Sequence, residues 1–503
     1  MTVLEADTSV AERGAPGALS PLAVFLCAMA LFWLCDPLGM GLLFDNQHYF
    51  FIAERAASGV PPHLSQFDPK HALSLLMTGA AIKLGRLIGA DDVYAARVLS
   101  LLVGATGAAL LWVLTLLLTR RRLAAWLAAL VMLSFSGFLE MVVMGSRPKT
   151  FLVLLAMATL VLPTLRRLLA AGAGAGLAFL CWQPALIFLG AIAAAALWEE
   201  RRPGPALLAL AGALAVQIPY EAYFAWHGAL GEQLVQAYVF PARYMAGEFA
   251  GFAGSLAELR EFWGAGFGPT FLLPVVFVLT LALGAVLFAA RPRWAAAELR
   301  ERPGWLAFGL AATSAAAFTF YDHQGFPDFF LVLPFVAVVV GWLAAAALTR
   351  ISQAWPPALA SAAALALLGG AAAWAVTQLP QPRVPYGLDE QRQLAQRVGE
   401  YLRSGKSVYA VGCVHLLALN HASNHLPYGF FFRGVEPYLL SRSHGSFFEP
   451  ARDGKMADVV LISRSDIYPV PDRKYWLGTR YVQLKDRAFN AQGIRVWIGV
   501  WNR

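Results

Sequence analysis

Residues 95–118 read AARVLSLLVGATGAALLWVLTLLL and are followed closely by Arg120-Arg121-Arg122. A run of about 20 apolar residues is long enough to cross a bilayer as a helix, and clustered arginines are typical of the cytoplasmic side. The rest of the chain has the same character, because 58% of its 503 residues are hydrophobic and only 14% are charged, with a mean hydropathy of +0.58. This composition excludes a soluble globular protein and predicts many membrane crossings.

Further apolar runs predict about eleven transmembrane helices. We expect these helices near residues 20–44, 95–118, 123–144, 149–165, 169–182, 184–198, 204–222, 269–290, 304–320, 328–348 and 356–377. If the N-terminus is cytoplasmic, every even-numbered helix ends beside arginine. Those arginines are Arg120 to Arg122, Arg166-Arg167, Arg201-Arg202, Arg291 with Arg293, and Arg350. Residues 169–198 form either two short helices or one long tilted helix, and a single helix would reverse the orientation of all that follows.

The segment 71–88 is apolar but carries Lys83 and Arg86, so we expect it to lie flat in the membrane interface. The long polar stretches then become outer loops at 45–94 and 223–268, with a short outer turn at 321–328. The four cysteines form no disulfide framework and are expected to be packing residues.

Residues 378–503 are predicted to form a separate, soluble, extracytoplasmic α/β domain after a proline-containing linker. Residues 389–403 have helical spacing, whereas 407–411, 458–462 and 494–498 have strand character. The chain has no P-loop and no Rossmann glycine fingerprint, which argues against ATP-driven or dinucleotide chemistry. The net charge of +8 is explained partly by the cytoplasmic arginines, so no nucleic-acid partner is expected.

The outer end of the first apolar run carries a carboxylate in the sequence Phe44-Asp45-Asn46-Gln47-His48-Tyr49. This opening resembles that of the GT-C glycosyltransferases, above all the dolichyl-phosphate-mannose protein mannosyltransferases and the lipid A aminoarabinose transferase. The matching positions are Asp45, Tyr49, Ala53 and Gly59, and Ser146-Arg147-Pro148-Lys149 is similar to a second family feature. The chain departs from the family where Asp68-Pro69-Lys70-His71 replaces the order Glu-Lys-Pro-Pro.

The resemblance implies an all-α polytopic membrane bundle of the GT-C type, residues 1–377, with an extracytoplasmic α/β domain at 378–503. It implies an enzyme of the bacterial inner membrane, with a cytoplasmic N-terminus and a periplasmic C-terminal domain. Such a glycosyltransferase takes a sugar from a polyprenyl-phosphate donor and passes it to an acceptor hydroxyl on a lipid, a glycan or a protein. The resemblance also implies that catalysis needs no metal.

In this chemistry a carboxylate accepts the proton of the attacking hydroxyl, and cations stabilise the departing lipid phosphate. We expect Asp45 to be the base. Asp36 is a second catalytic candidate if it lies at membrane depth, unless Asp36-Pro37 marks an early helix end. The expected phosphate-binding residues are Lys70, Arg147, Lys149, Arg243 and His323, and the expected substrate-binding residues are His48, Tyr49, Glu54, Asp68, Tyr244 and Gln324.

Several of these residues also have plainer interpretations. Glu54 and Arg55 favour a local ion pair, and Arg147 with Lys149 are equally typical of membrane-edge anchors. In the tail, His421 and His425 have helical spacing, but no acidic or cysteine partner is arranged nearby in sequence except Cys413, so no metal site is expected there. The competing functions are a ligase for a lipid pyrophosphate glycan, a lipid or glycan transporter or flippase, and a non-catalytic envelope assembly protein. No inverted repeat supports the transporter.

Overall fold

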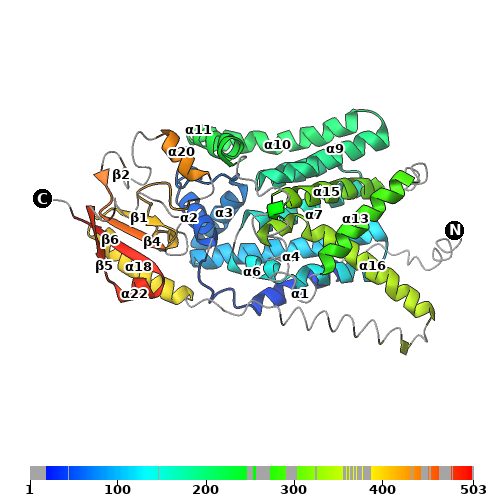
Figure 1. The fold of residues 1–503 in the computed structure, drawn as a ribbon, viewed down its shortest axis with the longest axis horizontal. Coiled ribbons are helices and arrows are strands. Elements are labelled where there is room, and N and C mark those ends of the chain that lie inside the picture. The colour runs from blue at the N-terminus through cyan, green and yellow to red at the C-terminus, as the bar shows by residue number, and fades with distance from the viewer. Residues whose placement is uncertain are drawn as a thin grey trace.

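The structure is a computed structural model, drawn in Figure 1. It describes residues 19–43, 45–145, 147–245, 253–255, 272–290, 299, 303–322, 326–354, 358–359, 362, 366, 370, 377, 387–431, 434–442, 451–452, 455–463, 477 and 480–500.

Helices make up most of the part of the chain that the structure describes. Up to residue 354 they are α1 (Leu19–Trp33), α2 (Asp45–Ala57), α3 (Leu73–Leu87), α4 (Asp92–Thr119), α5 (Arg122–Ser134), α6 (Ser136–Met144), α7 (Pro148–Thr164), α8 (Leu168–Phe179), α9 (Leu186–Glu200), α10 (Gly204–Trp226), α11 (Leu230–Leu234), α13 (Leu272–Ala290), α15 (Pro303–Tyr321) and α16 (Leu333–Ala354). Short 3₁₀ or π-helical turns also occur at η2 (Gln183–Ala185), η3 (Val235–Val239), η4 (Pro241–Met245) and η7 (Phe326–Leu331).

Within the described residues, 4 helices are long and apolar enough to cross a membrane, or 5 if the bent pair α5 and α6 forms one span. They are α4, α10, α15 and α16, and the shorter apolar helices include α1, α7 and α8. This number is smaller than the sequence-based count. One reason is that α1 ends at Trp33, well short of the expected residue 44. Another is that most of residues 356–377 lie outside the described part.

A bend of 66° separates α5 from α6. The backbone of Phe135 is extended there, at φ −75° and ψ 105°, and its buried ring packs against Phe329 and Phe330 of η7, with ring centroids 5.7 and 6.3 Å away. The expected helix 123–144 is therefore two helices, with the bend at Phe135 beside Ser136-Gly137. Residues 169–198 likewise form two helices, α8 and α9, joined by η2.

The helix α4 lies at the centre of the bundle and packs against α1, α5 and α7, with Trp112 fully buried. Small residues bring other helices into close contact. A Cβ placed at Gly341 of α16 would lie 2.6 Å from the backbone nitrogen of Ala128 in α5. Close approach at small residues is a common way to pack helices in a membrane, where dispersion replaces the hydrophobic effect.

The C-terminal part consists of helices around a small sheet and lies at one end of the molecule, beyond α2 and α3 (Figure 1). Its elements are α18 (Leu388–Arg403), β1 (Val408–Val411), α19 (His415–Ala418), α20 (Val435–Arg442), β2 (Ala451–Arg452), β3 (Lys455–Met456), β4 (Val459–Ser463), β5 (Tyr481–Leu484), α22 (Arg487–Ala491) and β6 (Ile494–Gly499). The main sheet has the order β1-β4-β6-β5; β1 and β4 are parallel, and the other two pairings are antiparallel. The helix and three strands expected from the sequence are α18, β1, β4 and β6.

One hydrophobic core runs through α2, α3 and the C-terminal part. Phe51 and Leu75 belong to the same buried cluster as Leu417 and Leu461. The side-chain amide of Gln391 also forms two hydrogen bonds with the backbone of Leu42, donating to its oxygen at 3.0 Å and accepting from its nitrogen at 2.7 Å. The C-terminal part is therefore fixed against the segment that leads into α2.

Candidate functional site

The helix α2 begins at Asp45, so a carboxylate lies at the positive end of the helix dipole. The helix is polar in sequence, yet residues 46–55 are buried, which places a hydrophilic helix inside the protein. The Asp45 side chain keeps 35% of its surface exposed and forms an ion pair with Arg147. This carboxylate is thus held beside a cation while part of its surface stays open to a substrate.

Arg147 immediately precedes α7, where Pro148 occupies the first turn. The preceding Gly145 has a φ of +125°, a conformation that favours glycine. The Arg147 side chain is only 7% exposed, and its guanidinium carbon lies 5.9 Å from the centre of the Tyr49 ring. The guanidinium faces Asp45 inside the protein, which differs from the pattern of a snorkelling membrane-edge anchor.

Lys70 lies on the other side of Tyr49. Its ammonium group donates a hydrogen bond of 2.7 Å to the Tyr49 hydroxyl, and its backbone nitrogen donates to Asp68 at 2.9 Å. The buried Asp68 also lies 3.2 Å from Nε2 of His48. Four residues from α2 and from the segment between α2 and α3 are therefore joined in one hydrogen-bonded group, even though the sequence here departs from the family order.

Lys149 forms an ion pair with Asp328 of η7, and its ammonium lies 4.6 Å from the centre of the Trp182 ring. Neither Asp328 nor Trp182 was expected from the sequence to belong to the site. The signal for Asp328 is a carboxylate in the short outer turn between two apolar runs, a position that it shares with Asp322. We use the name Asp45 site for Asp45, His48, Tyr49, Asp68, Lys70, Arg147, Lys149 and Asp328.

The charges of the Asp45 site act on one another. Burial alone would raise the pKa of Asp45, but Arg147, Lys70 and Lys149 outweigh it and hold that pKa below its ordinary value. Burial is likewise opposed at Asp68, where a hydrogen bond and charge from His48, with Lys70, lower the pKa. Burial, with Asp45 and Asp68, raises the pKa of Tyr49 well above its ordinary value. At neutral pH Asp45 and Asp68 are therefore ionised, and Tyr49 is neutral.

Other expected site residues lie elsewhere. Asp36 is exposed in the turn after α1 and accepts a hydrogen bond from the Gly39 nitrogen at 3.1 Å. Arg243 is exposed on η4, and Tyr244 packs against Phe240 and Tyr438. His323 and Gln324 lie outside the described residues. The early helix end, one of the two interpretations of Asp36-Pro37, is the one observed.

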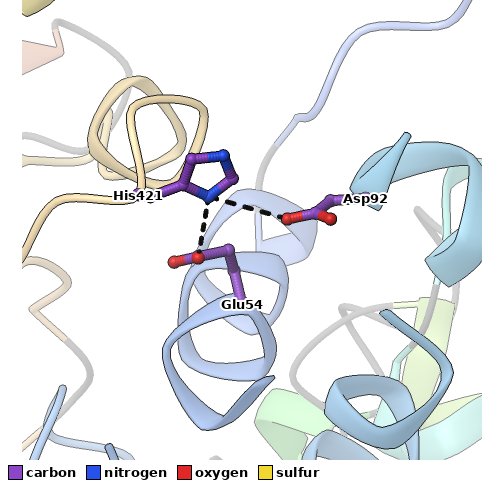
Figure 2. A group of neighbouring side chains, drawn as sticks. All are labelled: Glu54, Asp92 and His421. Atoms are coloured by element: carbon purple, nitrogen blue, oxygen red, sulfur yellow. Dashed lines mark hydrogen bonds and ion pairs between the residues drawn. The ribbon is translucent and has the colours of Figure 1, made fainter. Parts of the chain in front are cut away.

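Glu54 belongs to a second charged group, shown with His421 and Asp92 in Figure 2. Its carboxylate lies 3.0 Å from the His421 ring nitrogen and 2.8 Å from Nη2 of Arg86. Arg86 also donates to both oxygens of Asp92, at 2.6 to 3.2 Å. Three potential metal ligands meet here, but the Arg86 guanidinium already bonds both carboxylates. We call Glu54, Arg86, Asp92 and His421 the Glu54 cluster; it links α2, α3 and α4 to the C-terminal part.

At one end of the bundle, the partly exposed carboxylate of Asp45 lies beside three basic side chains. These are Lys70, Arg147 and Lys149, and the rings of Tyr49 and Trp182 lie next to them. A carboxylate of this kind can take a proton from a hydroxyl. Cations that face the same space can bind a phosphate and stabilise its negative charge as it departs.

The solved structures that resemble the chain are GT-C glycosyltransferases of membranes. ArnT from Cupriavidus metallidurans bound to undecaprenyl phosphate matches with a TM-score of 0.57 at 15% identity, over 96% of this chain and 99% of that one. The Archaeoglobus fulgidus oligosaccharyltransferase in its apo form matches with a TM-score of 0.51 at 14% identity, over 88% of this chain and 70% of that one. No protein-family model matches the sequence, and no curated protein matches it significantly.

At these identities the comparisons show the fold. The chain has the GT-C fold, as the resemblance in sequence implied, and its membrane-length helices agree with several spans. The count of eleven spans and the boundary at residue 377 stay predictions. The correspondence with ArnT covers almost the whole of both chains, so the small C-terminal sheet falls within the region of similarity.

Proposed function

We propose that this protein is a glycosyltransferase that moves a sugar from a polyprenyl phosphate to an acceptor hydroxyl, with Asp45 as the general base. The observation that carries the proposal is the ion pair between Asp45 and Arg147, with Lys70 and Lys149 beside it. The GT-C fold supports it, and so do solved structures of that fold that contain undecaprenyl phosphate or dolichol phosphate.

In the proposed reaction the acceptor oxygen attacks the anomeric carbon while its proton passes to Asp45. The bond between the anomeric carbon and the phosphate oxygen breaks, and the polyprenyl phosphate leaves with the electron pair. A carboxylate with a lowered pKa is a weak base, so proton transfer must accompany formation of the new bond. The exact position of Asp45 then matters more than its basicity.

The donor phosphate competes with Asp45 for the same cations in this proposal. Without a substrate Arg147 pairs with Asp45, and Lys149 pairs with Asp328. A phosphate that binds Arg147, Lys149 and Lys70 weakens the hold on Asp45 and leaves its carboxylate available to the acceptor. His48 and Asp68 keep Lys70 in place through the bonds described above.

The proposal also covers the membrane setting of the Asp45 site, the donor sugar and the acceptor. We place the Asp45 site on the outer face of a bacterial inner membrane, with about eleven spans, a cytoplasmic N-terminus and residues 378–503 on the outer side. The donor sugar is a hexose or a pentose, and the acceptor is a lipid, a glycan or a protein.

The test is mass spectrometry of envelope lipids, glycans and exported proteins from a deletion strain complemented with wild type, Asp45→Asn or Asp389→Asn. Asp389 is the control, because it does not belong to the Asp45 site and its side chain is 84% exposed on α18. We expect a sugar-sized mass that wild type and Asp389→Asn restore and Asp45→Asn does not. Equal amounts of each protein in the membrane must be verified.

Two results would contradict the proposal at different points. Full restoration by Asp45→Asn would remove Asp45 as the base while keeping the transferase. A deletion that changes no glycan would reject the transferase and favour the transporter or the assembly protein.

A further inference from the structure

A small cavity lies directly behind Asp45, between α2, α3, α4 and the turn from α6 to α7. The residues that line it include Asn46, Thr78, Arg97, Met144 and Gly145. The proposed transfer reaction uses none of these five residues.

Arg97 is the charged group of this cavity. It belongs to the membrane-length helix α4 and is fully buried, with 0% of its surface exposed. Nη2 donates to the carbonyl oxygen of Gly41 at 3.1 Å and to that of Met40. Its Nε and Nη1 have no hydrogen-bond partner, and no carboxylate of the described residues lies at ion-pair distance. A buried guanidinium with unused donors is costly unless something else satisfies it.

Asn46 is the second unsatisfied group. It directly follows Asp45 in α2 and is 2% exposed, and both its amide nitrogen and its amide oxygen have no partner in the described part of the chain. Two neighbouring buried side chains that line one cavity therefore leave four polar atoms without hydrogen bonds. Most buried polar groups in proteins are satisfied by protein or by ordered water.

The size of the cavity restricts what can bind there. About 10 Å³ is open to the centre of a water molecule, which is room for roughly one water. A phosphate group or a sugar does not fit, so the cavity is distinct from the proposed donor site.

We propose that this cavity binds one small hydrogen-bond acceptor, a water molecule or a chloride ion, held between Arg97 and Asn46. The bound species accepts a hydrogen bond from one edge of the Arg97 guanidinium and one from the Asn46 amide, and Arg97 in turn holds the carbonyl oxygens of Met40 and Gly41. That segment leads into Asp45, so Arg97 fixes the backbone at the start of α2. The inference does not depend on the proposed reaction, because it rests on burial and unsatisfied groups alone.

The first test is a crystal structure of the full-length protein grown in sodium bromide. We expect one density peak within hydrogen-bond distance of Arg97 and Asn46. An anomalous signal at that peak identifies a halide site, and a peak without one identifies water. An empty cavity, at a resolution that shows other buried waters, would overturn the proposal.

The second test compares Asn46→Leu with the nearly isosteric Asn46→Asp, which supplies a fixed anion to Arg97. In chloride, we expect Asn46→Leu to lower the melting temperature by roughly 2–4 °C and Asn46→Asp to preserve it. If the site takes chloride, replacing chloride with gluconate at equal ionic strength lowers the melting temperature of wild type but not of Asn46→Asp; if it takes water, neither changes. An Asn46→Leu variant with an unchanged melting temperature would count against the site, and a variant that fails to fold leaves the bromide structure to decide.

Discussion

The Asp45 site and the Glu54 cluster lie at opposite ends of the same helix, α2, and both combine carboxylates with basic side chains. In the Glu54 cluster a single guanidinium, that of Arg86, bonds both carboxylates and lies 3.3 Å from the His421 ring nitrogen. In the Asp45 site the carboxylates of Asp45 and Asp328 pair with different cations, and Asp45 keeps a third of its surface open. The charged residues of α2 therefore belong to two different arrangements. The Glu54 cluster holds chain segments together, whereas the Asp45 site contains basic side chains that a phosphate can bind.

The largest expected effect is on transfer by Arg147→Met. Removing the cation that pairs with Asp45 should lower the rate of sugar transfer by about 10²–10³-fold, because charge on the departing phosphate loses a stabilising group. Arg147→Lys should retain part of the activity, since it keeps the charge but not the planar fork. The measurement is a transfer assay on purified protein with a labelled polyprenyl-phosphate sugar.

The control for this loss is Arg202→Met, because the Arg202 side chain is 75% exposed after α9. It should transfer at the wild-type rate. If Arg147→Met also did so, the Asp45 site would be no more reactive than the Glu54 cluster, and the distinction between them would fail.

The next effect is on stability rather than on transfer. Arg86→Met leaves the fully buried Glu54 carboxylate without its main cation, which should lower the free energy of unfolding by about 1–3 kcal/mol. The loss stays in this range because the Arg86 side chain is 31% exposed, so that solvent screens its ion pairs. Thermal unfolding in detergent at a fixed scan rate measures the loss. Transfer per folded molecule should stay near wild type, and a selective loss of transfer would instead assign the Glu54 cluster to the reaction.

The third effect is a shift in pH dependence. Because Arg147, Lys70 and Lys149 hold the pKa of Asp45 below its ordinary value, activity in wild type should fall only at a pH below the usual titration range of an aspartate, where the base becomes protonated. In Arg147→Met the effect of burial is less opposed, so the pKa of Asp45 rises and the acid limb moves to higher pH. The residual activity of that variant, measured from pH 4 to 8, shows the shift. An acid limb that does not move would mean that another group is the base.

Much of the Asp45 site could be predicted from the sequence. Asp45, Tyr49, Arg147 and Lys149 stand at the ends of apolar runs, where a membrane forces polar groups to the surface. The pairing of Asp328 with Lys149 was not predicted, because it spans 179 residues and no local pattern indicates which residue reaches Lys149. The bend between α5 and α6 lies at Phe135, beside Ser136-Gly137, and a Gly/Ser pair is a common place for a helix to kink.

The arrangement of the C-terminal part shows a similar limit. The apolar positions of α18 predicted that one face of the helix would be buried. They did not indicate that Gln391 on the same helix would bond the backbone of Leu42, or that α2 and the sheet would share one core. Periodicity predicts that a face is covered and says little about which segment covers it.

The smallest expected effect separates Asp45 from the other early carboxylate, Asp36. Both follow the first apolar helix, and sequence alone made both candidates. Asp36 is exposed, has a φ of +50° and accepts one local hydrogen bond from Gly39, so Asp36→Asn should change stability by no more than about 0.5 kcal/mol and leave transfer unchanged. Asp45→Asn in the same assay should lower transfer by about 10²–10³-fold. If Asp36→Asn alone lost activity, the base would lie in the turn after α1, and the ion pair of Asp45 with Arg147 would be structural, like that of Glu54 with Arg86.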